Sequence, residues 1–207
     1  MEERKLNIIF RCDATKKIGM GHLFRCIPIA KKISLKSKSI IFLGNYEIDA
    51  IKIIKNNGFE IYEIRNILEQ ESEYIAIYKA CKKFRVDSII FDIRTGFKRD
   101  QISKIKKFFN VKIFLIDDSN DRRLASDFCF YPPVKQFKKL KWSEFRGKVY
   151  SGMEWIPIRE DFLKDYKRKN NQKTRILIFC GGSDNFNISQ FIVNALVKIN
   201  LEFEAII

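Results

Sequence analysis

The amino-acid sequence predicts an α/β fold in which a parallel sheet carries helices on both faces. Short apolar runs alternate with segments of helical periodicity from residue 5 to residue 117. The first apolar run leads through a glycine-containing loop into a helical segment, which is typical of Rossmann-like units. Polar residues stand just after several of the runs, at the sheet edge where parallel α/β proteins bind their ligands.

The first predicted elements follow from apolar spacing and from one helix-ending glycine. Residues 5–12 form a short apolar run that fits a buried strand, and after a loop, residues 22–35 place apolar side chains at helical spacing. A second apolar run at 39–43 predicts the next strand. Residues 47–57 predict a helix that ends before Gly58, because glycine readily takes the left-handed conformation common after a helix.

The same alternation continues through the next elements. Apolar runs predict strands over residues 60–64, 88–92 and 112–117. The segments between them predict helices over residues 72–84 and 98–109. Helices that cross over between parallel strands cover both faces of the sheet. We therefore expect one doubly covered parallel sheet within an N-terminal domain, residues 1–155.

The rest of the chain has a different character. Residues 131–155 contain a Pro-Pro pair, many lysines and no clear period, so we expect an irregular connection there. A linker is predicted over 156–173. Residues 174–207 then contain a strand, a glycine turn at 181–184, a helix and a further strand. Two strands and one helix bury too little apolar surface for a core of their own. Either this piece packs onto the first domain or it is the start of a second, nucleotide-binding domain of a longer protein, and we expect the latter.

Composition and charge restrict the function classes. The formal net charge is +15, yet the lysines are spread along the chain, so nucleic-acid binding is not the expected function. A basic surface also suits an anionic substrate such as a nucleotide diphosphate. The five cysteines stand singly, without paired or metal-ligand spacing, which predicts buried thiols in a reducing compartment.

Targeting signals are not evident in the sequence. No apolar stretch reaches the length of a membrane span, and the N-terminus lacks the long apolar segment of a signal peptide. The sequence therefore predicts a cytoplasmic protein. Its oligomeric state is left open.

The loop with the sequence IGMGH carries the strongest chemical signal. Gly19 and Gly21 permit positive φ and a close approach of the backbone to a ligand, and the following helix points its free N–H groups toward that ligand. His22 is the only histidine of the chain, and imidazole is well suited to general base catalysis near neutral pH. The alternatives are a plain tight turn and a hydrogen-bonded structural histidine.

Several charged residues are predicted near the same edge of the sheet. Asp13, Arg25, Asp92 and Arg94 could contact a substrate, or they could cap helices and form surface ion pairs. The aspartates at 117–118 could be read as a metal pair, but the arginines that follow favour neutralisation by ion pairing. We expect neither a metal nor a cofactor. The glycine turn after the later strand suits a diphosphate, and its alternative is a simple turn.

Five motifs occur in order along the chain: RCDATKKIGMGHLFRC, SIIFDIRTG, FLIDDSNDRRLASD, YSGMEWIPIREDF and ILIFCGGSDNFN. Through them the chain resembles the UDP-2,4-diacetamido-2,4,6-trideoxy-β-L-altropyranose hydrolases of pseudaminic acid biosynthesis and the related spore-coat polysaccharide proteins. The resemblance runs through almost the whole chain. It implies the GT-B architecture of two Rossmann-like domains with the substrate between them, and a distant relation to the transferase that adds N-acetylglucosamine to the lipid-linked peptidoglycan precursor.

The resemblance also implies a reaction and a set of site residues. The histidine of the GxGH loop, here His22, would activate a water that attacks the anomeric carbon and releases UDP with C–O cleavage and inversion. The residues expected to bind the UDP-sugar are Asp13, Gly19, Gly21, Arg25, Asp92, Arg94, Gly181, Gly182, Ser183, Asp184 and Asn187.

One departure from the resemblance concerns the sugar. Many of these hydrolases carry Asp-His-Tyr where this chain has Asp92-Ile93-Arg94, and exchange of a tyrosine for a cation predicts a different sugar. Two other functions stay open: a GT-B glycosyltransferase, which passes the sugar to an acceptor alcohol, and a non-catalytic module that binds a sugar or a partner protein.

Overall fold

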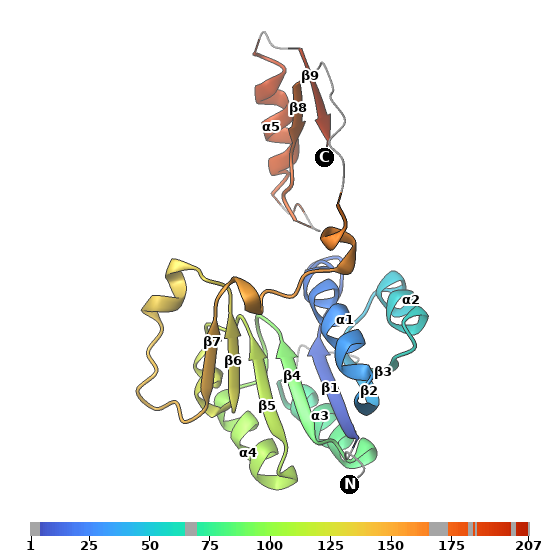
Figure 1. Ribbon diagram of the computed structural model, residues 1–207, viewed down its shortest axis with the longest axis vertical. Coiled ribbons are helices and arrows are strands. Elements are labelled where there is room, and N and C mark those ends of the chain that lie inside the picture. Colours follow the sequence, from blue (N-terminus) through green and yellow to red (C-terminus); the bar gives the residue numbers. More distant parts are fainter. Residues whose placement is uncertain are drawn as a thin grey trace.

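The computed structural model describes residues 5–64, 70–165, 174–181, 184, 186–199 and 202–206. Within them, a seven-stranded parallel sheet has the order β3-β2-β1-β4-β5-β6-β7 (Figure 1). Its strands are β1 (Leu6–Cys12), β2 (Ser37–Gly44), β3 (Glu60–Glu63), β4 (Ser88–Asp92), β5 (Lys112–Ile116), β6 (Phe128–Tyr131) and β7 (Lys148–Ser151). The predicted α/β fold with a parallel sheet is confirmed.

Helices cover both faces of this sheet, as the alternating pattern predicts. They are α1 (Gly21–Ser34), α2 (Ile48–Asn56), α3 (Gln70–Phe84) and α4 (Arg99–Phe109). Two separate apolar cores result, because successive strand residues point to opposite faces. Ile9 of β1 lies in the core with α3 and α4, whereas Ile8 and Phe10 lie in the core with α1 and α2.

The strand order reverses between β1 and β4, and this reversal positions the site. From β1 the chain runs outward through β2 and β3, then returns to place β4 on the other side of β1. The helices that leave the two central strands therefore separate and open a crevice at the carboxyl ends. The parallel register pairs Cys12 with Asp92 at this edge, and Asp92 is 1% exposed.

The prediction of an irregular connection over residues 131–155 is wrong in part. The edge strand β7 lies within it, and β6 reaches its first residue, Tyr131. Four-residue strands are too short to show a period among so many lysines. Aromatic packing holds the segment between β6 and β7 in place, because Trp142 packs edge-on against Tyr131 and also lies under the guanidinium of Arg123. That arginine donates a 2.6 Å hydrogen bond to the carbonyl of Lys141.

A separate two-stranded parallel sheet begins at Thr174. It consists of β8 (Thr174–Leu177) and β9 (Phe203–Ile206), joined through α5 (Ile188–Leu196). No residue of α5 is buried, and the large side chains of Phe186 and Phe191 are 86% and 75% exposed. This unit thus has little core of its own, and the domain boundaries at 155 and 174 stay a proposal.

Four of the five cysteines are buried free thiols, and Cys180 is half-buried. In the part of the chain that the structure describes, no helix combines the length and apolar character that a membrane crossing needs.

A buried ion-pair network lies below the crevice. Arg11, at 1% exposure, donates from Nε to Glu73 Oε1 at 2.8 Å and from a terminal nitrogen to Asp13 Oδ1 at 2.7 Å. Burial by itself lowers the pKa of Arg11, but the two carboxylates outweigh it and raise the pKa. The second oxygen of Glu73 accepts the backbone N–H of Phe97 at 3.1 Å. A Cβ on Gly96, whose φ is +86°, would lie 2.4 Å from that oxygen.

We expect replacement of Glu73 by alanine to lower the free energy of unfolding by about 3–5 kcal/mol, since it leaves the buried charge of Arg11 with one partner fewer. The N–H of Phe97 would lose its acceptor as well. Urea denaturation of the variant and the parent measures the difference. Glu144→Ala is the matched control, because it removes a 63% exposed partner of Arg99. A loss in Glu73→Ala no larger than that in the control would contradict the role of the network.

Candidate functional site

The candidate site lies at the carboxyl ends of β1 and β4. Helix α1 begins at Gly21, so its first turn brings His22 over the end of β4. There His22 Nδ1 lies 2.7 Å from Asp92 Oδ1, and the two side chains are 12% and 1% exposed. The predicted base and a predicted substrate ligand are thus partners of each other.

The glycine loop closes tightly before α1. Gly19 has a φ of +81°, and its N–H donates to the carbonyl of Thr15 at 2.7 Å. Gly21 does not adopt positive φ, contrary to the use expected for both glycines, because it already belongs to the helix. A Cβ built on Gly21 would meet no atom within 4 Å, so the space in front of the helix is open. No side chain caps the start of α1, and its first turn holds no acidic residue, so its free N–H groups suit an anion.

Asp92 has a second partner, the cation of Arg25. Arg25 donates from Nε to Asp92 Oδ2 at 2.7 Å, and one of its terminal nitrogens bonds Oδ1. Burial by itself raises the pKa of Asp92, but the hydrogen bonds from His22 and Arg25 and the charge of Arg25 outweigh it and lower the pKa below its ordinary value. The carboxylate is therefore ionised at neutral pH.

This ionisation decides which nitrogen of His22 carries the proton. An ionised carboxylate only accepts hydrogen bonds, so Nδ1 of His22 is the donor to Asp92. In the neutral ring, Nε2 then keeps its lone pair and can accept a proton. The geometry is that of a carboxylate-oriented general base.

Two further residues extend the cluster along the sheet edge. The remaining terminal nitrogen of Arg25 lies 3.5 Å from Asp117 Oδ2, and Arg94 donates to the same oxygen at 3.1 Å. Asp117 has a left-handed φ of +51°, and its N–H donates to Phe130. Arg94 is the exposed end of this chain of charges, with a side chain that is 59% exposed.

A buried arginine that we did not expect in the site holds the loop bearing Arg94. Arg122, at 2% exposure, donates to the carbonyls of Ile93 at 3.0 Å, Gly96 at 3.0 Å and Phe97 at 3.2 Å. Its Nε pairs with Asp118, as the arginines after the aspartate pair predict. The sequence signal was the SNDRR segment, which gave the ion pair and not the loop contacts.

The other expected ligands lie apart from this cluster. Asp13 is 8% exposed, and its Oδ1 accepts from Arg11 and from the backbone N–H of Asn45. Asp184 accepts the N–H groups at the start of α5, while Gly181 and Asn187 have positive φ. Gly182 and Ser183 lie outside the described residues. Among the residues that are described, no hydrogen bond or ion pair joins this turn to the His22 cluster.

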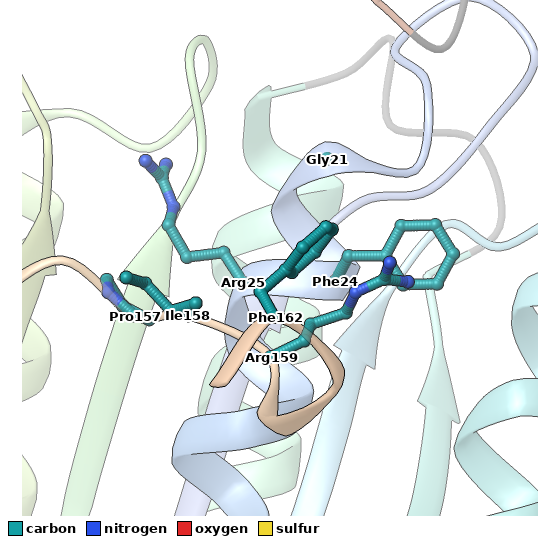
Figure 2. A pocket seen from close by; sticks show the side chains of 7 residues that line it. All are labelled: Gly21, Phe24, Arg25, Pro157, Ile158, Arg159 and Phe162. Atoms are coloured by element: carbon teal, nitrogen blue, oxygen red, sulfur yellow. The ribbon is translucent and has the colours of Figure 1, made fainter. Parts of the chain in front are cut away.

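A pocket of about 330 Å³ adjoins the start of α1 (Figure 2). One wall comes from Gly21, Phe24 and Arg25. The other wall comes from residues of the predicted linker: Pro157, Ile158, Arg159 and Phe162. No substrate ligand is predicted from the sequence in this segment, which stands out only as part of the motif YSGMEWIPIREDF.

Comparison with curated proteins finds two relatives. The chain is 25% identical over 207 residues to an uncharacterised protein of Methanocaldococcus jannaschii. It is 27% identical over 201 residues to the UDP-2,4-diacetamido-2,4,6-trideoxy-beta-L-altropyranose hydrolase of Campylobacter jejuni. The alignments include 96% and 95% of this chain, and 41% and 68% of the respective relatives. The resemblance predicted from the ordered motifs is confirmed, while no family model matches the chain.

Three solved structures share the fold of this chain. They are MurG of Acinetobacter baumannii (TM-score 0.58, 13% identity), Alr3699/HepE of Anabaena in complex with UDP-glucose (0.60, 11%) and UDP-GlcNAc 2-epimerase of Neisseria meningitidis bound to UDP-GlcNAc (0.55, 10%). The matches cover 96%, 97% and 98% of this chain and 57%, 59% and 65% of those chains. They show the Rossmann-like, GT-B-type fold that the sequence predicts.

Proposed function

We propose that this chain carries the catalytic base of a nucleotide-sugar hydrolase that removes UDP from a UDP-diacetamido-trideoxy sugar, with inversion at the anomeric carbon. The observation that carries the proposal is the hydrogen bond between His22 and the buried Asp92, where the strand order reverses. A base oriented by an ionised carboxylate fits the activation of water. The similarity to the Campylobacter hydrolase supports the substrate class.

His22 removes a proton from the attacking water. Because Asp92 holds the Nδ1–H, the proton passes to Nε2 while the water oxygen bonds to the anomeric carbon. The bond from that carbon to the diphosphate oxygen breaks, and its electron pair leaves with UDP. Asp92 stabilises the imidazolium, and Arg25 keeps Asp92 ionised. The free N–H groups of α1 stabilise the charge that develops on the leaving group.

The sugar is assigned to the exposed end of the cluster. Arg94 stands on a loop fixed by Arg122 and is oriented by Asp117. A guanidinium offers several hydrogen-bond donors where many of the hydrolases that the sequence resembles carry a tyrosine, so it suits a different member of the sugar class. We place the reaction in the cytoplasm, in the synthesis of a nonulosonic (pseudaminic-type) acid or a surface polysaccharide.

The remaining predicted ligands divide between two roles. Asp13 supports the site from below through Arg11, since its Oδ1 already accepts two hydrogen bonds. The turn at 181–184 belongs to the unit that we propose to be the start of the nucleotide-binding domain. In this assignment, its backbone binds the diphosphate while Asp184 caps α5.

Incubation of the chain with UDP-sugars in the absence of any acceptor tests the proposal. A hydrolase releases UDP and an equal amount of free reducing sugar, which coupled UDP detection and a reducing-end assay measure separately. Release only when an acceptor alcohol is added would instead indicate a glycosyltransferase. Binding of UDP-sugar in calorimetry without turnover would indicate a binding module.

A further inference from the structure

The segment 157–163, here called the strap, crosses the beginning of α1 and carries an arginine in an unusual setting. The guanidinium carbon of Arg159 lies 5.3 Å from the ring centre of Phe24 and 4.9 Å from that of Phe162. Figure 2 shows its side chain reaching toward Phe24, while Arg25 extends away from it on the other side. The two rings thus hold a half-buried cation at the pocket wall.

Arg159 differs from the other arginines around the site in its polar contacts. Arg11, Arg25 and Arg122 each bond at least one carboxylate. The backbone carbonyl of Arg159 accepts the N–H of Phe162 at 3.0 Å, but within the described ranges its guanidinium makes no hydrogen bond and no ion pair and contacts only the two aromatic rings. All of its N–H donors are therefore available to a ligand.

The pocket beside Arg159 suits an anion. Among the described residues, its lining contains two guanidinium groups and no carboxylate. Arg25 already pairs with Asp92, so the positive charge of the lining that has no carboxylate partner among the described residues is that of Arg159. The same lining includes Gly21, the residue before the proposed base, which places the pocket next to the reacting end of the site.

We infer that Arg159 binds the diphosphate of the nucleotide-sugar substrate and holds the leaving group beside His22. This inference rests on the proposed function. The planar guanidinium can donate to two phosphate oxygens at once. Its position against Phe24 and Phe162 orients these N–H donors before a ligand binds. Because Phe24 belongs to α1, the stacking also ties the strap to the helix that carries the base.

Calorimetric titration of the full chain with inorganic pyrophosphate tests the inference without requiring turnover. Arg159→Met keeps the length of the side chain and removes its charge, and we expect the affinity for pyrophosphate to fall about 10- to 100-fold. Lys164→Met is the control: it removes a cation that follows the strap directly but pairs with Asp161 and does not line the pocket. It should leave the affinity unchanged.

Two results would overturn the inference. One is an equal affinity for pyrophosphate in Arg159→Met and in the parent. The other is a parent that binds pyrophosphate no better than neutral uridine, which serves as the reference ligand without charge. Arg159→Lys should recover part of the affinity, because it restores the charge without the planar fork. The titration also separates this inference from the proposed function. Pyrophosphate binding that depends on Arg159, in a chain that hydrolyses no UDP-sugar, would remove the hydrolase and keep the anion site.

Discussion

Replacement of His22 by alanine is expected to lower the turnover number for UDP-sugar hydrolysis by about 10²–10⁴-fold, because the attacking water loses its general base. Binding of UDP should stay nearly unchanged, since UDP is the leaving group and does not receive the proton from the base. Steady-state kinetics gives the turnover number, and calorimetry with UDP gives the affinity.

The control for this variant stands at the other end of the same helix. Lys32→Ala removes an exposed side chain from the last turn of α1 and should leave both turnover and UDP affinity as in the parent. Full turnover in His22→Ala would remove the proposed role of the histidine. Loss of UDP affinity together with turnover would mean that His22 binds the nucleotide instead of activating water.

Replacement of Asp92 by asparagine should have an effect of similar size, a fall of about 10²–10⁴-fold in the turnover number. An amide can donate to His22 Nδ1, which favours the ring form whose Nε2 carries the hydrogen and cannot act as a base. Arg25 would also lose its principal carboxylate. Kinetics measures the first effect, and urea denaturation measures the accompanying loss of stability.

The double variant His22→Ala/Asp92→Asn shows whether Asp92 acts through His22 or contributes to turnover independently of it. Because Asp92 acts through His22, the double variant should turn over as slowly as His22→Ala alone. Asp100→Asn, which loses an exposed pair with Lys104, is the matched control for the carboxylate change. Multiplied effects in the double variant, or near-parental turnover in Asp92→Asn, would show that the carboxylate does not orient the base.

Most of the fold could be predicted because its signals are local. The apolar run of β4 is buried at all five positions, and the left-handed glycine after α2 is present as expected. The strand β7 could not be predicted, since a four-residue edge strand shows no period of its own. Its place depends on pairing with β6, a contact between segments distant in sequence.

The site was predicted in its residues and not in its contacts. His22 and Asp92 are 70 residues apart, and what joins them is the adjacency of β1 and β4, a property of strand order. For the same reason, the sequence could not show that Arg25 would pair with Asp92. Asp13 lies just after a strand end, as predicted. It nevertheless pairs with Arg11, two residues earlier, and so belongs to the buried ion-pair network.

The position of a solvent oxygen atom tests the central claim, that His22-activated water attacks the anomeric carbon, most directly. The reaction is run with a UDP-sugar in ¹⁸O-labelled water, and the products are separated for mass spectrometry. We expect one labelled oxygen at the anomeric position of the released sugar and none in UDP, with a label yield that falls in parallel with turnover in His22→Ala. Label in the phosphate of UDP, or labelled sugar formed by His22→Ala at the parental rate, would contradict it.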